Sequence, residues 1–143
     1  MNNEKIKLFL VDDDIVFLKS LEIEFLQHAN FSIETYASGE LCLANLTHCP
    51  DVIILDYLLD GINKTAINGI QTLDRIKAVN PDIPVVMLSS QDKIEVAVDC
   101  MHHRAFDYVV KSETAFVRLQ KIITTIFTYK KMEKELNWYM ERM

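Results

Sequence analysis

The sequence lacks the features that mark membrane-spanning and nucleic-acid-binding proteins. No apolar run approaches the roughly 20 residues that a membrane-spanning helix needs, so we expect no association with a membrane. Basic residues are outnumbered, with 15 Lys and Arg against 21 Asp and Glu and a net charge of −6. Because binding to nucleic acid requires clustered Lys and Arg that contact phosphates, this balance argues against direct contact with nucleic acid.

Cysteine is scarce and follows no metal-binding pattern. The three residues, Cys42, Cys49 and Cys100, are odd in number and do not have the spacing of metal ligands. The N-terminus shows no secretory signal. We therefore expect reduced thiols and a cytoplasmic location.

Gly and Pro are also scarce, at three residues each, and short apolar runs alternate with longer segments of helical periodicity. This alternation is typical of βαβ units, and 143 residues suit one domain. We predict strands over residues 6–11, 32–37, 52–56, 84–89 and 106–110. We predict helices from residue 15 onward and over residues 38–48, 70–79, 94–103 and 112–143. Such strict alternation predicts an α/β fold with a doubly wound parallel sheet.

Polar residues close four of the five predicted strands. They are Asp12 and Asp13 after the first strand, Asp56 at the end of the third, Ser89 at the end of the fourth and Lys111 after the fifth. Ligand sites of such sheets lie at the carboxyl ends of the strands, so we expect these side chains to meet at one edge. The next residue, Asp14, is predicted to be the N-cap of the first helix.

This set of residues has a specific chemistry. Several carboxylates in one crevice repel one another and raise one another's pKa unless a cation intervenes. Mg²⁺ typically binds through one or two carboxylates while it keeps waters and phosphate oxygens as ligands. With the Lys111 ammonium and the Ser89 hydroxyl, such an ion would form a clamp for a phosphoryl group. A carboxylate in that clamp can itself be the nucleophile and form an acyl phosphate.

In these motifs the sequence resembles the receiver domain of two-component response regulators. The matching segments are residues 10–14, 52–56, 86–90 and 105–111, and the resemblance covers residues 5 to about 128. It implies a flavodoxin-like five-stranded parallel sheet in the order 2-1-3-4-5, for which this family is itself a standard example. We therefore divide the chain into a receiver domain, residues 1–128, and a C-terminal helical extension, residues 129–143, continuous with the fifth helix.

The resemblance implies a phosphoacceptor switch rather than a turnover enzyme. Asp56 would accept a phosphoryl group from the phosphohistidine of a histidine kinase or phosphotransfer protein. Mg²⁺ would be bound by Asp12 (mainly through water), Asp13, Asp56 and the backbone carbonyl of Leu58. The phosphorylated chain would then act on a downstream effector protein or domain.

The resemblance also implies how the switch would work. Ser89 and Lys111 would hold the phosphoryl oxygens, with Ser89 moving toward them. Tyr108 would report that movement to the face formed by the fourth helix, the fifth strand and the fifth helix. Leu58 and Gln91 occupy positions that tune dephosphorylation in the family. We expect the apolar Leu58 to hinder the attacking water and prolong the phosphorylated state.

Three features depart from the family pattern. Ser112 follows Lys111 where the family usually has Pro after a cis bond, and because a cis bond costs about 3 kcal/mol without proline, we expect a trans bond. Arg104 stands where a Gly is common, so a positive φ there would strain the backbone. The loop after Asp56 is enlarged by five residues within Gly61 to Asn68. It could be a tolerated insertion, since lengthening a loop costs little, or a partner-specific or gating loop.

The departures leave a second hypothesis open, a degenerate receiver that takes no phosphate and serves as a constitutive interaction module. Two other functions fit the residues poorly. An aspartyl-phosphate hydrolase usually has a second Asp two residues after its nucleophile, where this chain has Leu58. A flavin-binding protein needs a loop rich in Gly and hydroxyl groups after the first strand, where this chain has acidic residues.

The predicted last helix is longer than one sheet requires and contains no Gly or Pro. Its second half has apolar residues at alternating steps of three and four, a weak heptad pattern. They are Tyr129, Met132, Leu136, Tyr139 and Met143. The segment is either a frayed or packed extension, or a linker or dimerisation helix. The face of the fourth helix, fifth strand and fifth helix is the other candidate for a homodimer interface.

Overall fold

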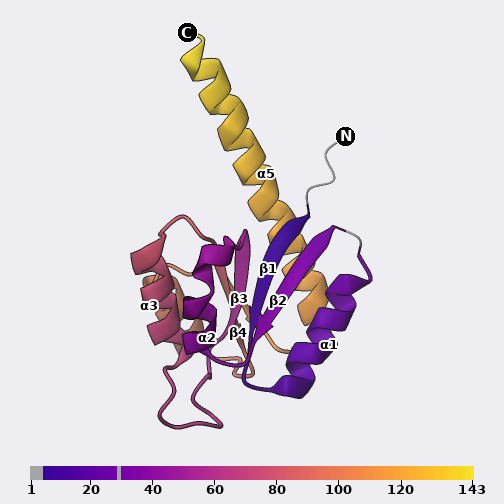
Figure 1. The fold of residues 1–143 in the computed structure, drawn as a ribbon, viewed down its shortest axis with the longest axis vertical. Coiled ribbons are helices and arrows are strands. Elements are labelled where there is room, and N and C mark those ends of the chain that lie inside the picture. The colour runs from indigo at the N-terminus through magenta and orange to yellow at the C-terminus, as the bar shows by residue number, and fades with distance from the viewer. Residues whose placement is uncertain (1–4, 29) are drawn as a thin grey trace.

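The structure, a computed structural model, describes residues 5–28 and 30–143 and contains a five-stranded parallel sheet with helices on both faces (Figure 1). The strand order β2-β1-β3-β4-β5 confirms the predicted flavodoxin-like fold. The strands are β1 (Ile6–Val11), β2 (Phe31–Tyr36), β3 (Val52–Asp56), β4 (Val85–Ser89) and β5 (Asp107–Val110). The helices are α1 (Ile15–Leu26), α2 (Gly39–Ala44), α3 (Gly69–Val79), α4 (Ile94–His102) and α5 (Ala115–Glu141), with a 3-10 turn η1 (Leu46–His48). Residues 1–4 and 29 of the predicted receiver domain lie outside the described residues.

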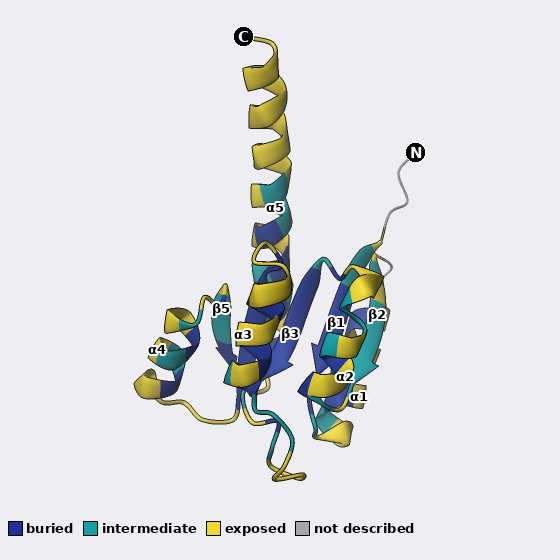
Figure 2. Ribbon diagram, turned by 60° about the vertical axis from the view of Figure 1, so that its left-hand side comes forward, coloured by how far each residue is buried: buried dark blue, intermediate teal, exposed yellow. Residues whose placement is uncertain are grey.

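Side chains of the central strands pack into two apolar cores, one on each face of the sheet. Successive residues of a strand point to opposite faces, so Leu8 and Leu10 join the core beneath α1 and α5. Phe9 and Val11 join the core beneath α2, α3 and α4. Every residue of β3 and β4 is buried (Figure 2). Fully burying a large apolar side chain contributes roughly 1.5–3 kcal/mol to the stability of the fold. The apolar residues of these two strands therefore fix them in the middle of the domain.

The predicted second helix, residues 38–48, is interrupted. It begins as expected, with the Ser38 hydroxyl accepting the Leu41 N–H, but α2 ends at Ala44 and the chain continues as η1. The Asn45 side chain donates a hydrogen bond to the Leu41 carbonyl at 2.8 Å. Cys49, the C-cap of η1, then takes up a left-handed conformation, which ends the helical path before Pro50.

Gly69 allows the chain to return directly beneath the end of β3. A Cβ atom at this position would overlap the Asp56 carbonyl oxygen and would lie 2.7 Å from the Tyr57 Cα. The Gly69 N–H donates to the Tyr57 carbonyl at 3.1 Å. The Asn68 side chain accepts the Gln71 N–H, and the Gln71 side chain accepts the Asn68 N–H. This capping box gives partners to backbone donors that the first turn of a helix leaves free. The enlarged loop, residues 57–68, is therefore closed at its base by a fixed helix start.

The structure confirms the trans bond expected between Lys111 and Ser112. Arg104 has a φ of 70°, in the left-handed region, where a residue with a side chain is strained and Gly is not. The turn before β5 thus has a backbone conformation that favours Gly even though the residue is Arg.

Helix α5 continues well beyond the domain (Figure 1). Its buried residues end at Ile126, and from Lys131 to Met143 every residue is exposed (Figure 2). The helix begins near the carboxyl ends of the strands and its far end projects past the opposite edge of the sheet. Among the described residues, no helix is long and apolar enough to cross a membrane.

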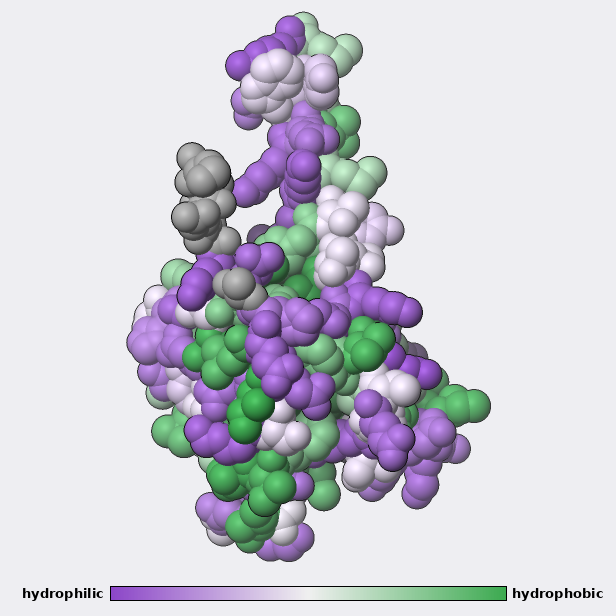
Figure 3. Space-filling model, turned by 90° about the vertical axis from the view of Figure 1, so that its right-hand side faces the viewer, coloured by the Kyte–Doolittle hydropathy of each residue, from purple (hydrophilic) through white to green (hydrophobic). Residues whose placement is uncertain are grey.

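Apolar side chains also reach the surface of α1 near the carboxyl edge of the sheet (Figure 3). Ile15, the first residue of α1, is 54% exposed. The reason is its place in the first turn, where Asp14 caps the helix by accepting the Val16 and Phe17 N–H groups. The core contacts of α1 begin one turn later, at Leu18.

Candidate functional site

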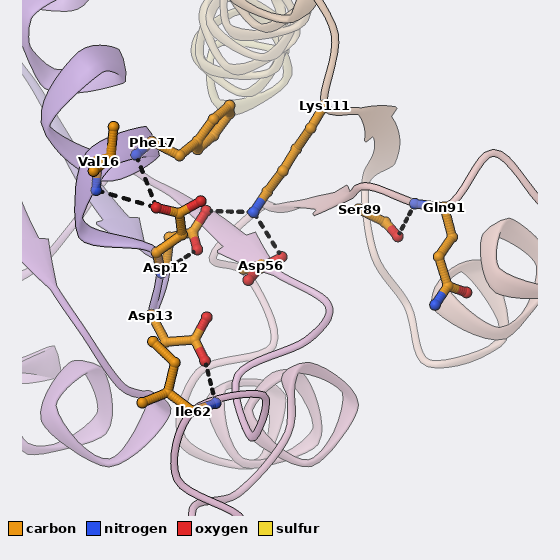
Figure 4. A network of polar contacts seen from close by, with 10 residues as sticks. Asp12, Asp13, Val16, Phe17, Asp56, Ile62, Ser89, Gln91 and Lys111 are labelled. Atoms are coloured by element: carbon orange, nitrogen blue, oxygen red, sulfur yellow. Dashed lines mark hydrogen bonds and ion pairs between the residues drawn. The ribbon is translucent and has the colours of Figure 1, made fainter.

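The polar residues at the strand ends gather at the carboxyl edge of the sheet (Figure 4). Asp12 and Asp13 follow β1, Asp56 is the last residue of β3, and Lys111 follows β5. Carboxylate oxygens of the three Asp residues, one from each, lie within 4.8 Å of one another. Ser89 ends β4 nearby. The parallel order of the sheet is what brings residues from four distant segments to one place.

Lys111 points into this cluster in spite of the Ser that follows it. Its Nζ lies 2.7 Å from Asp12 Oδ2 and 3.3 Å from Asp56 Oδ1. The lysine is held at both ends, because its N–H donates to the Ser89 carbonyl at 2.8 Å. Its ammonium also lies 4.6 Å from the centre of the Phe17 ring, a favourable placement for a cation. A trans bond to Ser112 therefore does not turn the side chain away from the site.

The charges of the site are not balanced. Asp12 and Asp56 are only 2% and 3% exposed, and burial disfavours an ionised carboxyl group. Burial is the largest cause that raises the pKa of Asp56, and the negative charge of Asp12 raises it further, while Lys111 opposes both. Burial lowers the pKa of Lys111, but Asp12 and Asp56 outweigh it and raise that pKa overall. One ammonium therefore faces two buried carboxylates.

A divalent metal ion fits this arrangement. Asp12 Oδ2 is buried, and among the described residues its close polar partner is the Lys111 ammonium at 2.7 Å. The same ammonium also pairs with Asp56, so the two buried carboxylates carry one more negative charge than it balances. A cluster of carboxylate oxygens is the donor set that hard cations such as Mg²⁺ prefer. Asp12, Asp13 and Asp56 could hold such an ion.

The residues expected to transmit a signal are linked to one another through Gln91. The Ser89 Oγ accepts the Gln91 N–H at 3.0 Å, and the Tyr108 hydroxyl donates to the Gln91 carbonyl. Ser89 is buried. Leu58, by contrast, lies beyond the end of β3 with its side chain 50% exposed. The roles of these four residues remain predictions.

One contact of the site was missed by the sequence analysis. The backbone N–H of Ile62, in the enlarged loop, donates to Asp13 Oδ2 at 3.3 Å (Figure 4). The only signal in the sequence was the unusual length of the loop, which did not indicate where the loop would lie.

Comparisons with known proteins agree on one family. The family model described as the response regulator receiver domain matches residues 8–124. The protein-glutamate methylesterase/protein-glutamine glutaminase of Clostridium acetobutylicum is 35% identical over 119 residues, which cover 79% of this chain and 32% of the relative. The transcriptional regulatory protein ZraR of Escherichia coli is 30% identical over 78% of this chain and 24% of its own length. The crystal structure of NtrX from Brucella abortus has a TM-score of 0.79 and 27% identity, covering 96% of this chain and 30% of that one. The chain spans about a quarter to a third of these proteins.

The raised pKa of Asp56 predicts a pH-dependent gain in stability for Asp56→Asn. Between the ordinary carboxyl pKa near 4 and its raised value, the folded state binds more protons at Asp56 than the unfolded state, so wild-type stability falls as pH rises through this range. Without divalent cations at pH 8, the variant should be more stable by up to about 4 kcal/mol, because the pKa of Asp56 is raised from 3.8 to about 7. The difference should shrink at pH 5. Urea unfolding at both pH values measures it.

Asp14→Asn is the matched control for this measurement. It makes the same chemical change two residues from Asp12, but Asp14 is exposed and Asn caps a helix as well as Asp does. Asp14→Asn should therefore not show the gain in stability expected for Asp56→Asn at pH 8. A stability gain for Asp56→Asn of the same size at pH 5 and pH 8 would contradict the prediction.

Proposed function

Because the chain belongs to the response regulator receiver domain family, we propose that it is a phosphorylatable signalling switch in which Asp56 is the phosphoacceptor. The observation that carries the proposal is the contact of Lys111 with both Asp12 and Asp56 beside a third carboxylate, Asp13. A degenerate receiver would have no need to keep this set of charges together at the cost of burying them. Turnover of an external substrate is not part of the proposed function.

The chemistry proposed for Asp56 is a single phosphoryl transfer. A carboxylate oxygen attacks the phosphorus of a phosphohistidine, the P–N bond breaks, and the imidazole of the partner leaves with the bonding pair. Lys111 and the Ser89 hydroxyl would hold phosphoryl oxygens, and Asp12, Asp13, Asp56 and the Leu58 carbonyl would hold Mg²⁺. The bound ion supplies positive charge against the phosphoryl oxygens and the carboxylates. Such positioned charge is the main source of catalysis in phosphoryl transfer.

The proposed switch runs from Ser89 through Gln91 to Tyr108. When Ser89 turns its hydroxyl to a phosphoryl oxygen, it gives up the hydrogen bond that it accepts from Gln91. Gln91 in turn carries the carbonyl that the Tyr108 hydroxyl contacts. Phosphorylation would therefore favour one of two arrangements of the α4–β5 surface by differential contacts, which is a population shift.

The proposed partners follow from this chemistry. A histidine kinase or phosphotransfer protein would supply the phosphoryl group in the cytoplasm, and an effector protein or domain would read the α4–β5–α5 surface. The curated relatives are longer than this chain, and one is named as a methylesterase and the other as a transcriptional regulator. An effector of either kind is compatible with a receiver that itself makes no contact with nucleic acid.

The central test is incubation with Mg²⁺ and acetyl phosphate, followed by intact-mass spectrometry. We expect the wild type to gain the mass of one phosphoryl group and Asp56→Asn to gain none, because the amide cannot form the acyl phosphate. Asp14→Asn should behave as the wild type does. Beryllofluoride, a phosphoryl mimic, should bind under the same conditions to the wild type but not to Asp56→Asn. A folded wild type that shows neither effect would favour the constitutive interaction module.

We propose that Leu58 prolongs the phosphorylated state by excluding the attacking water. Its side chain is half exposed just beyond the phosphoacceptor and has no group that could orient a water. Leu58→Asn should therefore shorten the half-life of the acyl phosphate severalfold, measured by loss of the phosphorylated mass after removal of the donor. Lys64→Asn, an exposed position in the same loop, is the control. A half-life that is unchanged or longer in Leu58→Asn would exclude this role.

We also propose that the exposed half of α5 pairs with α5 of a second copy. Four residues of the apolar stripe predicted from the heptad spacing lie on α5, and Met143 follows the end of the helix. Each of the five large side chains is at least 58% exposed. Leu136→Glu should abolish a dimer seen by sedimentation, since it places a charge within the stripe. Asn137→Glu, one residue along and outside the stripe, should not. If Ile94→Glu on α4 dissociates the dimer instead, the interface is the α4–β5–α5 surface.

A further inference from the structure

The enlarged loop reaches the one carboxylate of the site that Lys111 does not contact. Lys111 forms ion pairs with Asp12 and Asp56, whereas Asp13 lies at the other side of the cluster (Figure 4). Within residues 5–28 and 30–143, the Ile62 N–H is the single hydrogen-bond donor found for the Asp13 carboxylate, at Oδ2 and 3.3 Å. The second oxygen of Asp13 points away from Ile62, toward Asp56 (Figure 4).

Polar contacts hold the part of the loop that carries Ile62, whereas burial holds the start of the loop, where Leu59 is 1% exposed. The Ile62 side chain is 76% exposed, so the structural contribution of this residue comes from its backbone. Asn63 closes a turn by accepting hydrogen bonds from the Thr65 N–H and hydroxyl, at 3.1 and 2.7 Å. Farther along, the Ile67 N–H donates to Glu40 Oε2 on α2 at 3.2 Å. The Ile62 N–H therefore faces Asp13 from a loop that Leu59 anchors in the core before Ile62 and that the Ile67–Glu40 hydrogen bond ties to α2 after it.

The loop also leaves Asp13 accessible. A hollow of about 520 Å³ lies between the loop, the start of α1 and the start of α2, and Asp13, Ser38 and Ile62 are among the residues that line it. Each doubling of the length of a loop costs only about 0.6 kcal/mol. An insertion that was merely tolerated would therefore need no contact with the site. Here it contributes a directed donor to a carboxylate of the site and keeps that carboxylate open to solvent.

We propose that Ile62 is a positioning residue for the metal site: its N–H fixes the Asp13 carboxylate with one oxygen toward Asp56 and so increases the affinity for Mg²⁺. The inference rests on the proposed function, in that Asp13 must be a metal ligand. Hydrogen bonds to ligating carboxylates set the orientation of the ligands, and loss of such an outer partner typically lowers metal affinity by about 10–100-fold. Because this contact is exposed and long, the lower end of that range is expected.

The experiment compares Ile62→Pro, which removes the N–H, with Ile62→Ala, which keeps it. Isothermal titration with Mg²⁺ alone should give an affinity about tenfold weaker for the Pro variant and an unchanged affinity for the Ala variant. Unfolding in urea without divalent cations shows whether either variant is destabilised. A chain that lacks residues 62–66 provides a second way to remove the donor if Pro disturbs the fold, and it should lose affinity to the same extent.

A double-mutant cycle separates positioning from a general effect on the fold. In an Asp13→Asn background, Ile62→Pro should have no further effect on Mg²⁺ affinity, because the group that it positions is no longer a carboxylate ligand. Equal or tighter Mg²⁺ binding by Ile62→Pro, or an additive loss in the Asp13→Asn background, would overturn the inference. A wild type that binds no Mg²⁺ would instead count against the proposed function.

Discussion

One ammonium group, that of Lys111, faces two buried carboxylates, and the structure around the site is built to hold that imbalance. Removing charges from water costs several kcal/mol per ion unless partners replace the solvent. Lys111 is fixed by its backbone to β4 and by its side chain to Asp12 and Asp56. Its single positive charge is shared between these two carboxylates, so a net negative charge remains at the site. The site is therefore ready to accept further positive charge, and this readiness is the property that a phosphoryl ligand and its cation would exploit.

The apolar cores explain why such an unfavourable cluster can persist. β3 and β4 are buried along their whole length between two layers of helices, so the positions of Asp56 and Ser89 are set by packing that does not involve the charges. Gly69 adds a second constraint, because its close approach to the Asp56 carbonyl holds α3 against the same strand end. The stability of the cores thus offsets the cost of the carboxylates, and a change at the site need not disturb the fold.

The sequence predicted the parts of the structure that follow from periodicity. Buried strands are continuous apolar runs, so their ends were marked by Asp12, Asp56 and Lys111, and the parallel sheet places those ends together. The path of residues 57–68 was not predictable, because a loop has no period and its contacts depend on single backbone groups such as the Ile62 N–H. The break in the second helix was missed for a similar reason: it depends on one side chain, Asn45, competing with the helix.

Helix α5 starts four residues after Lys111 and runs without a break to Glu141. Its first half is packed in the core as far as Ile126, and the rest projects beyond the sheet. Its 27 residues make a rod about 40 Å long at about 1.5 Å per residue. A tilt of the whole helix by about 5° about its first turn would displace the far end by about 3.5 Å. A small rearrangement beside the charged cluster would thus become, at the tip, a displacement as large as an atomic contact distance. A rigid helix would carry it there without any change in its own hydrogen bonds.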